Sequence, residues 1–154
     1  MKCVPRTRAS SPTGWKADAV AAGYSNTPLA KKLSLRDGQR VWFDGMPEAI
    51  QDDIGEYALE LTFVGGPEEG PDAAHIFVTE RAQLEAKLVT LRDHMARDGH
   101  VWVSWPKQAA KLPTDITEDT IREVALPMGL VDTKVCAVDE TWSGLKLVIR
   151  KELR

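Results

Sequence analysis

The sequence predicts an α/β protein with a small, mostly parallel sheet, flanking helices and a C-terminal antiparallel β-hairpin. Three short apolar runs support this prediction, because branched and aromatic side chains favour extended backbone. The runs are Val41-Trp42-Phe43, Ile76-Phe77-Val78 and Val101-Trp102-Val103. Each ends in a polar residue and precedes a helix-like segment. That order is typical of a parallel sheet with crossover helices.

Residues 100–107 are expected to form the central strand. The run is apolar on both faces as far as Val103, which suits a strand that helices cover on both sides. Pro106 then removes a donor from the hydrogen-bond ladder and ends the strand.

The chain divides into an arm and one domain. Residues 1–22 are predicted to be a tail or a docked arm that Trp15 pins to the body, and residues 23–154 a single domain. A chain of this length buries roughly 70% of its unfolded surface, so neither a metal nor a disulfide is needed for folding.

Helix signals precede four segments. A cap residue followed by helical periodicity or a first-turn proline marks each start. We expect helices after Thr27-Pro28, over 47–56, over 80–97 with Thr79 as the cap, and after Thr117.

The remaining strands follow from alternation. Residues 59–63 alternate apolar and polar side chains, which predicts an edge strand with one solvated face. Residues 131–138 and 145–149 predict the terminal hairpin, and residues 65–72 are a loop by composition.

Composition excludes several classes of function. The net charge of −3 argues against non-specific nucleic-acid binding. No apolar run approaches the ~20 residues of a membrane span. The two cysteines are far apart in sequence, with Cys136 expected in the core, so we expect a cytoplasmic protein.

The element order from about residue 39 to 150 resembles a shortened class I methyltransferase, a Rossmann-like fold. That family binds S-adenosylmethionine at a glycine-rich turn after its first strand. Here the turn reads Phe43-Asp44-Gly45-Met46-Pro47, with one glycine, and the second strand lacks the acidic residue that the family places at its end. The resemblance therefore implies the scaffold, and we expect no cofactor.

Three segments also resemble an uncharacterised family of short bacterial domains of unknown function. They are residues 23–33, Val103-Ser104-Trp105-Pro106-Lys107, and residues 135–146, which read VCAVDETWSGLK. This resemblance implies no activity.

The candidate ligand site is the rim formed by the carboxyl ends of the strands, where open parallel sheets bind their ligands. If the hairpin follows the methyltransferase arrangement, its tip joins this rim. Two tryptophans, two lysines and small polar groups would suit a small, partly apolar anion. The alternative is that both tryptophans pack the hairpin onto the sheet while the lysines are solvated. The candidate residues are Asp44, Thr79, Ser104, Trp105, Lys107, Lys111, Asp139, Trp142 and Ser143, with Arg81, Glu140 and Thr141 nearby.

No catalytic or metal-binding residues are predicted. Ser104 lacks a flanking glycine elbow and has no histidine in its own segment, so it is not expected to be a nucleophile. His75 and His100 are expected to open neighbouring strands as hydrogen-bonded surface residues, since two histidines alone make a weak metal site.

The leading functional hypothesis is a non-catalytic small-molecule-binding or regulatory domain. Two alternatives remain open: an enzyme that acts on a small anionic metabolite at the rim, and a protein-interaction module that uses the edge at residues 59–63 and the arm with Trp15. The sequence names no protein partner.

Overall fold

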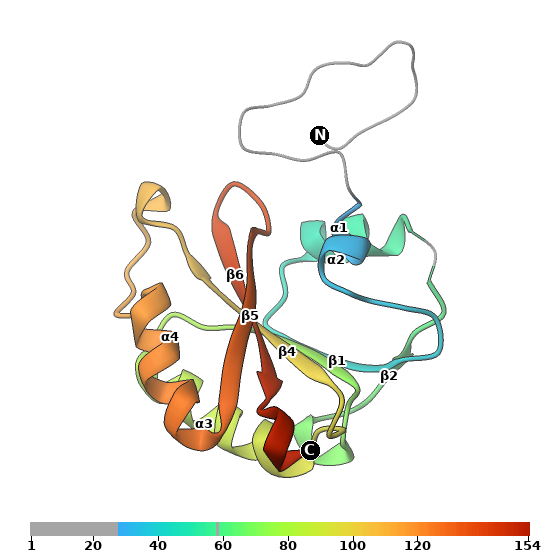
Figure 1. Cartoon of the computed structure of the whole chain (residues 1–154). Helices are drawn as coiled ribbons and strands as arrows, with labels where there is room; N and C mark the ends of the chain where they lie inside the picture. Colours follow the sequence, from blue (N-terminus) through green and yellow to red (C-terminus); the bar gives the residue numbers. More distant parts are fainter. Residues whose placement is uncertain (1–27, 58) are drawn as a thin grey trace.

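The computed structural model describes residues 28–57 and 59–154, which form a sheet of six strands in the order β2-β1-β3-β4-β6-β5 (Figure 1). The first four are parallel neighbours, whereas β6 runs antiparallel to both β4 and β5. The predicted α/β class with a terminal antiparallel hairpin is confirmed. The strands are β1 (Arg40–Asp44), β2 (Thr62–Phe63), β3 (Ala73–Phe77), β4 (His100–Pro106), β5 (Leu130–Ala137) and β6 (Trp142–Ile149).

Four α-helices in the described ranges cover the two faces of the sheet. Helices α3 and α4 lie on one face and α1 and α2 on the other (Figure 1). Their bounds are α1 (Leu29–Lys32), α2 (Glu48–Gly55), α3 (Arg81–His94) and α4 (Glu118–Ala125), with short 3-10 turns at Pro67–Glu69, Gln108–Ala110, Leu126–Met128 and Lys151–Leu153. None of these helices has the length and apolar character that crossing a bilayer requires.

Strand β4 alternates between the two faces, as the period of a strand requires. Val101, Val103 and Trp105 pack into the core under α3 and α4. Trp102 packs into the core under α1 and α2. Every residue of β4 is buried, so the stretch predicted to be the central strand is confirmed in that role.

One row of side chains crosses the face under α1 and α2. The strand register pairs Phe43 with His75, His75 with Trp102, Trp102 with Lys146, and Lys146 with Lys134. The row therefore changes from aromatic at β1 to cationic at β5.

Two predicted caps have different outcomes. Thr117 caps α4 as predicted, in a reciprocal pair of hydrogen bonds with Thr120. The prediction that Thr79 caps the long helix is wrong. Glu80 occupies the N-cap position of α3, and the Thr79 backbone N–H donates to Gln83 Oε1 over 3.3 Å.

The predicted edge strand is an edge, although only Thr62 and Phe63 are paired. Helix α3 ends at His94, three residues before the predicted end. Thr27, Trp15 and the boundary after residue 22 lie outside the described residues.

Candidate functional site

The carboxyl ends of β1, β3 and β4 meet at one edge of the sheet, and the turn between β5 and β6 lies beside them. Pro106 is the register partner of Trp142. The Lys107 backbone N–H donates to the Thr141 carbonyl over 2.8 Å. The strand ends and the hairpin tip are therefore neighbours on the rim where ligands of open sheets bind.

The two tryptophans of this rim point to opposite faces of the sheet. Trp105 is 8% exposed and packs into the core under α3 and α4. Trp142 packs on the other face, with its ring edge toward Phe77 at a centroid distance of 5.0 Å. The tryptophans thus pack the hairpin and the sheet, and they do not converge on one pocket.

Several predicted rim residues already have partners within the fold. Asp44 forms an ion pair with Lys87 of α3. The Thr79 carbonyl accepts hydrogen bonds from Thr114 Oγ1 at 2.7 Å and from the Asp115 N–H at 3.2 Å. Asp139 Oδ1 accepts the N–H groups of Thr141 and Trp142, each at 2.8 Å, which holds the hairpin turn.

Two more of the predicted residues, Ser143 and Lys111, lie on different segments. Ser143 sits within β6, paired with Trp105 on one side and Ala137 on the other. Lys111 follows the 3-10 turn Gln108–Ala110 in a left-handed conformation with φ of 56°. Neither residue lines the hollow that opens beside Lys107.

That hollow lies between the end of β4 and the start of α4 and has a volume of about 450 Å³. It is large enough for a metabolite-sized ligand. Of the predicted site residues, Trp105 and Lys107 contribute to its wall. The remaining lining comes from the end of β4, the loop after it and the first turn of α4: Pro106, Gln108, Leu112, Thr114, Ile116, Thr117 and Glu118.

Ser104 has a histidine partner that the sequence does not reveal. His75 Nε2 lies 2.6 Å from Ser104 Oγ. His75 is the third residue of β3, not its first, and it is 2% exposed, so the prediction of a surface histidine is wrong. His100 does open β4, but it is also buried.

Burial sets the charge of both imidazoles. It lowers the pKa of His75 to about 3, with nearby His100 adding to the effect. Burial also lowers the pKa of His100 to about 4, together with the charge of Lys146. Both rings are therefore neutral near pH 7, and a neutral His75 can accept a hydrogen bond from the Ser104 hydroxyl. Ser104 is fully buried, however, so a substrate cannot reach its oxygen in this conformation.

The turn after β1 is filled by side chains. Gly45 has φ of +72°, and a Cβ there would lie 3.4 Å from the Phe77 carbonyl. Met46 and Phe77 are each 7% exposed. The Phe77 ring stacks on His75 at a centroid distance of 4.5 Å.

Among the described residues we find no group of three histidine, cysteine or acidic side chains placed to hold a metal ion.

Solved methyltransferase structures share this fold. N-methyltransferase NodS from Bradyrhizobium japonicum is 12% identical, with a TM-score of 0.51 over 80% of this chain and 93% of NodS. Precorrin-6y C5,15-methyltransferase from Geobacter metallireducens is 14% identical, with a TM-score of 0.50 over 79% of this chain and 85% of that enzyme. At such identities the likeness establishes the fold alone.

Sequence comparison supplies the family. No curated protein matches the sequence significantly. The family model described as "Protein of unknown function (DUF3052)" matches residues 30–151, which is most of the chain and includes two of the segments singled out above in full. The chain therefore belongs to the DUF3052 family of proteins of unknown function and has a methyltransferase-like fold.

Proposed function

We propose that this chain is a non-catalytic small-molecule-binding or regulatory domain on a methyltransferase-like scaffold. In that scaffold a glycine-rich turn after the first strand lets backbone approach the cofactor. Here the turn has one glycine, followed by Met46 and Pro47.

The filled turn is the observation that supports this proposal. Met46 and Phe77 are buried at the carboxyl ends of β1 and β3, and Trp142 packs edge-on against Phe77. A cofactor in this position would have to displace them. Burial of a large apolar side chain contributes ~1.5–3 kcal/mol, so displacing two would consume a large part of a cofactor's binding free energy.

Calorimetric titration of the full-length chain with S-adenosylmethionine and with S-adenosylhomocysteine tests the proposal. We expect no saturable heat from either ligand. Binding in the micromolar range, about −8 kcal/mol, would overturn the proposal.

An enzyme that acts on a small anionic metabolite is the second candidate, and the hollow beside Lys107 favours it. Lys107, which carries a positive charge, and the polar residues Thr114 and Thr117 line one concave surface. A thermal-shift screen of anionic metabolites should then find a ligand that stabilises the wild type and the control Lys151→Ala but not Lys107→Ala. Equal responses from all three proteins would exclude the hollow as the site.

A protein-interaction module is the third candidate. A second hollow of about 160 Å³ lies between α2 and the sheet edge, and its wall includes Phe43 and Phe63. Phe63 is 64% exposed, and Leu59 and Leu61 of the same wall are only partly buried, so this edge presents an apolar surface. A pull-down with the wild type should then recover one partner reproducibly, and a pull-down with Phe63→Asp should not recover it. Recovery by both proteins would exclude this edge.

A further inference from the structure

Two lysines lie directly opposite each other on the face under α1 and α2. Lys134 of β5 is the register partner of Lys146 of β6. The register shift between Asp132 and Lys134 sets this pairing. Like charges in opposed positions of an antiparallel pair destabilise the pair, so an anion bound between these two lysines would stabilise it.

The segment after α1, residues 33–36, lies over this part of the sheet, and we call it the strap. Trp102 Nε1 donates to the Leu33 carbonyl over 2.9 Å. Lys146 Nζ donates to Ser34 Oγ over 3.1 Å, and Ser34 has a left-handed backbone with φ of 62°. Non-glycine residues rarely adopt this conformation, and such strained positions cluster at binding sites.

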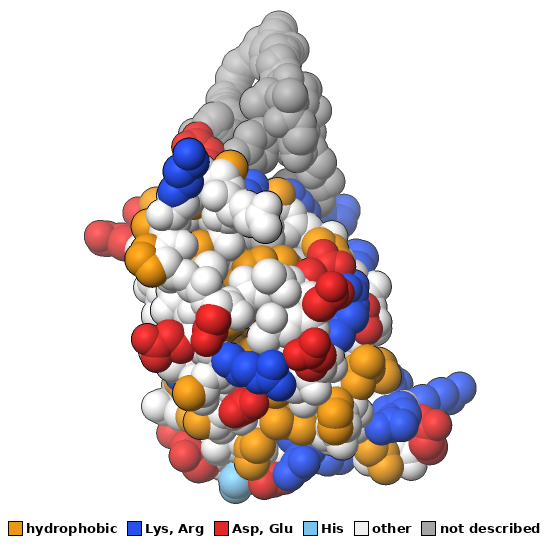
Figure 2. Space-filling model, turned by 90° about the vertical axis from the view of Figure 1, so that its left-hand side faces the viewer, with side chains coloured by type: hydrophobic (Ala, Val, Ile, Leu, Met, Phe, Trp, Pro, Cys, Tyr) orange, Lys and Arg blue, Asp and Glu red, His pale blue; other side chains and the backbone are white. Residues whose placement is uncertain are grey.

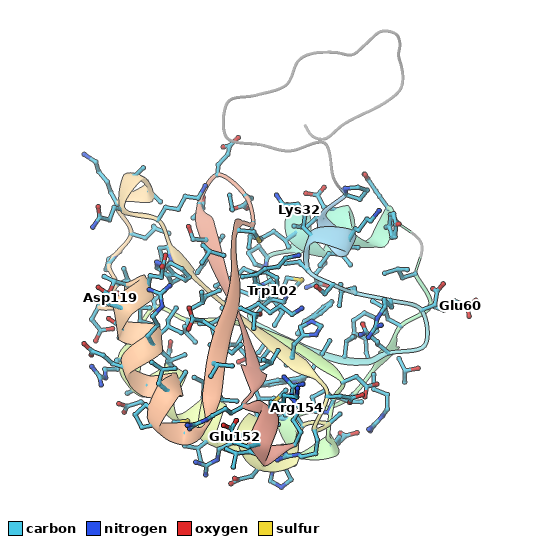
Figure 3. All side chains as sticks on the ribbon, viewed as in Figure 1. Lys32, Glu60, Trp102, Asp119, Glu152 and Arg154 are labelled. Carbon is cyan, nitrogen blue, oxygen red and sulfur yellow. The ribbon has the colours of Figure 1, made fainter. Side chains whose placement is uncertain are left out.

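A second lysine contact joins α1 to the hairpin. Lys32 Nζ donates to the Ala137 carbonyl over 3.2 Å. Figure 3 shows Lys32 and Trp102 on the same side of the sheet, toward α1 and α2. The cations of α1, the strap and the hairpin therefore gather around one patch.

The charges that shift the pKa values of Lys146 and His100 are positive. Partial burial lowers the pKa of Lys146, and the charges of Lys134 and Arg36 lower it further. The pKa of His100 is lowered by burial and by the charges of Lys146 and Arg36, whereas a hydrogen bond with the Leu33 backbone raises it. In neither case does a carboxylate act in the opposite direction, although the chain as a whole has a net charge of −3.

The opposite side of the molecule shows the usual pattern. Arg81 pairs with Glu85 and Glu123. Arg122 pairs with three carboxylates, those of Glu118, Asp119 and Asp132. Figure 2 shows basic and acidic side chains interleaved over the face that carries α4. The hairpin lysines contrast with this pattern.

We propose that Lys134, Lys146, Arg36 and the Ser34 hydroxyl form a binding site for a small phosphate-bearing molecule. Ammonium and guanidinium donors together with a hydroxyl match the oxygens of a phosphate group. The bound anion reduces the repulsion between the two opposed lysines and neutralises the charge of the half-buried Lys146. The site lies on the other face of the sheet from the hollow beside Lys107, so it does not depend on the function proposed for the rim.

His100 supplies an internal reporter. It is buried, and its Nε2 has no hydrogen-bond partner among the described residues. Lys146 and Arg36 are close enough to lower its pKa, so an anion bound between them has the opposite effect and raises it.

Titration of the full-length protein with inorganic phosphate, followed by NMR of the histidine ring protons, tests the proposal. Potassium chloride at matched ionic strength controls for screening. We expect phosphate to shift the His100 signals saturably and to raise the His100 pKa, and chloride to do neither. Lys146→Met and Arg36→Gln should each weaken phosphate binding about tenfold or more.

Two further comparisons keep the test decisive. Arg36 is exposed, so Arg36→Gln should fold even if the loss of the Lys146 contact loosens the strap. Lys151→Met, in the exposed 3-10 turn Lys151–Leu153, should bind phosphate like the wild type. The proposal is overturned if chloride reproduces the phosphate effect, if the shifts do not saturate, or if Lys151→Met weakens binding as much as Arg36→Gln.

Discussion

Acid should destabilise this protein through its two buried histidines well before its carboxylates titrate. The pKa values of His75 and His100 in the folded state are about 3 and about 4, both below the ordinary value of 6.5. At pH values between the folded-state pKa values and 6.5, the histidines of the unfolded chain bind protons that those of the folded chain do not. The free energy of unfolding therefore increases with pH in this range, and it decreases as the pH falls below 6.5.

The size of the effect follows from the shifts. Each pKa unit corresponds to about 1.4 kcal/mol. A fall from pH 6.5, where the unfolded imidazoles are half protonated, to pH 5.0 stays above both folded-state values, so each histidine should cost about 1.6 kcal/mol and the pair about 3 kcal/mol. Ordinary stabilities are about 5–15 kcal/mol, so a loss of this size is readily measured. Carboxylates in the unfolded chain titrate near pH 4, which leaves this window to the histidines.

Urea denaturation of the full-length chain at half-unit steps from pH 5.0 to 7.5 measures the slope. The slope of the wild type should steepen below pH 6.5 and approach about 2.5 kcal/mol per pH unit between pH 5.5 and 5.0, and His75→Asn or His100→Gln should each show about half that slope. Asparagine at position 75 keeps a polar partner for Ser104, and the slope does not depend on the absolute stability of a variant. A flat wild-type profile, or variants that retain the full slope, would refute the reasoning.

Three further predictions concern stability measured by urea denaturation. Gly99→Ala should cost about 1–3 kcal/mol, because its Cβ would lie 2.4 Å from the Asp72 carbonyl oxygen; a neutral result would show that the turn relaxes freely. Thr117→Ala should cost about 1 kcal/mol through loss of the α4 cap, and Thr117→Asn should restore most of it. Lys87→Met should cost no more than about 1 kcal/mol, since its ion pair with Asp44 is partly exposed; a larger cost would indicate a more deeply desolvated pair.

Local pattern was sufficient for most elements of the fold. The apolar runs that predict β1, β3 and β4 are strands in the structure, with β3 and β4 buried throughout, and Thr117 caps α4. Thr79 shows where local pattern fails. It has the chemistry of a cap, but its carbonyl is bound by Thr114 and Asp115 from the loop before α4. That contact spans more than thirty residues, so the sequence around Thr79 carries no sign of it.

The candidate site depends on strand register, which the sequence constrains less. Trp105 and Trp142 are neighbours on the rim, yet one pairing step decides which face each side chain takes. The contact between His75 and Ser104 is not predicted for the same reason. A strand that starts at His75 places this residue away from Ser104, whereas β3 begins two residues earlier and brings the two together.

The phosphate site and the buried histidines are linked through His100, and the link gives a test of both. A bound phosphate should raise the pKa of His100 toward that of the unfolded chain, so less stability is lost on acidification. Phosphate itself carries more negative charge at pH 7 than at pH 5, so the wild type is compared with His100→Gln at each pH. Phosphate should stabilise the wild type more than His100→Gln at pH 5, and the two proteins equally at pH 7. Chloride, which only screens charge, should not reproduce this dependence on pH. If phosphate stabilised the wild type and His100→Gln equally at both pH values, the anion would not be bound close to His100, and the assignment to Lys134, Lys146 and Arg36 would be wrong.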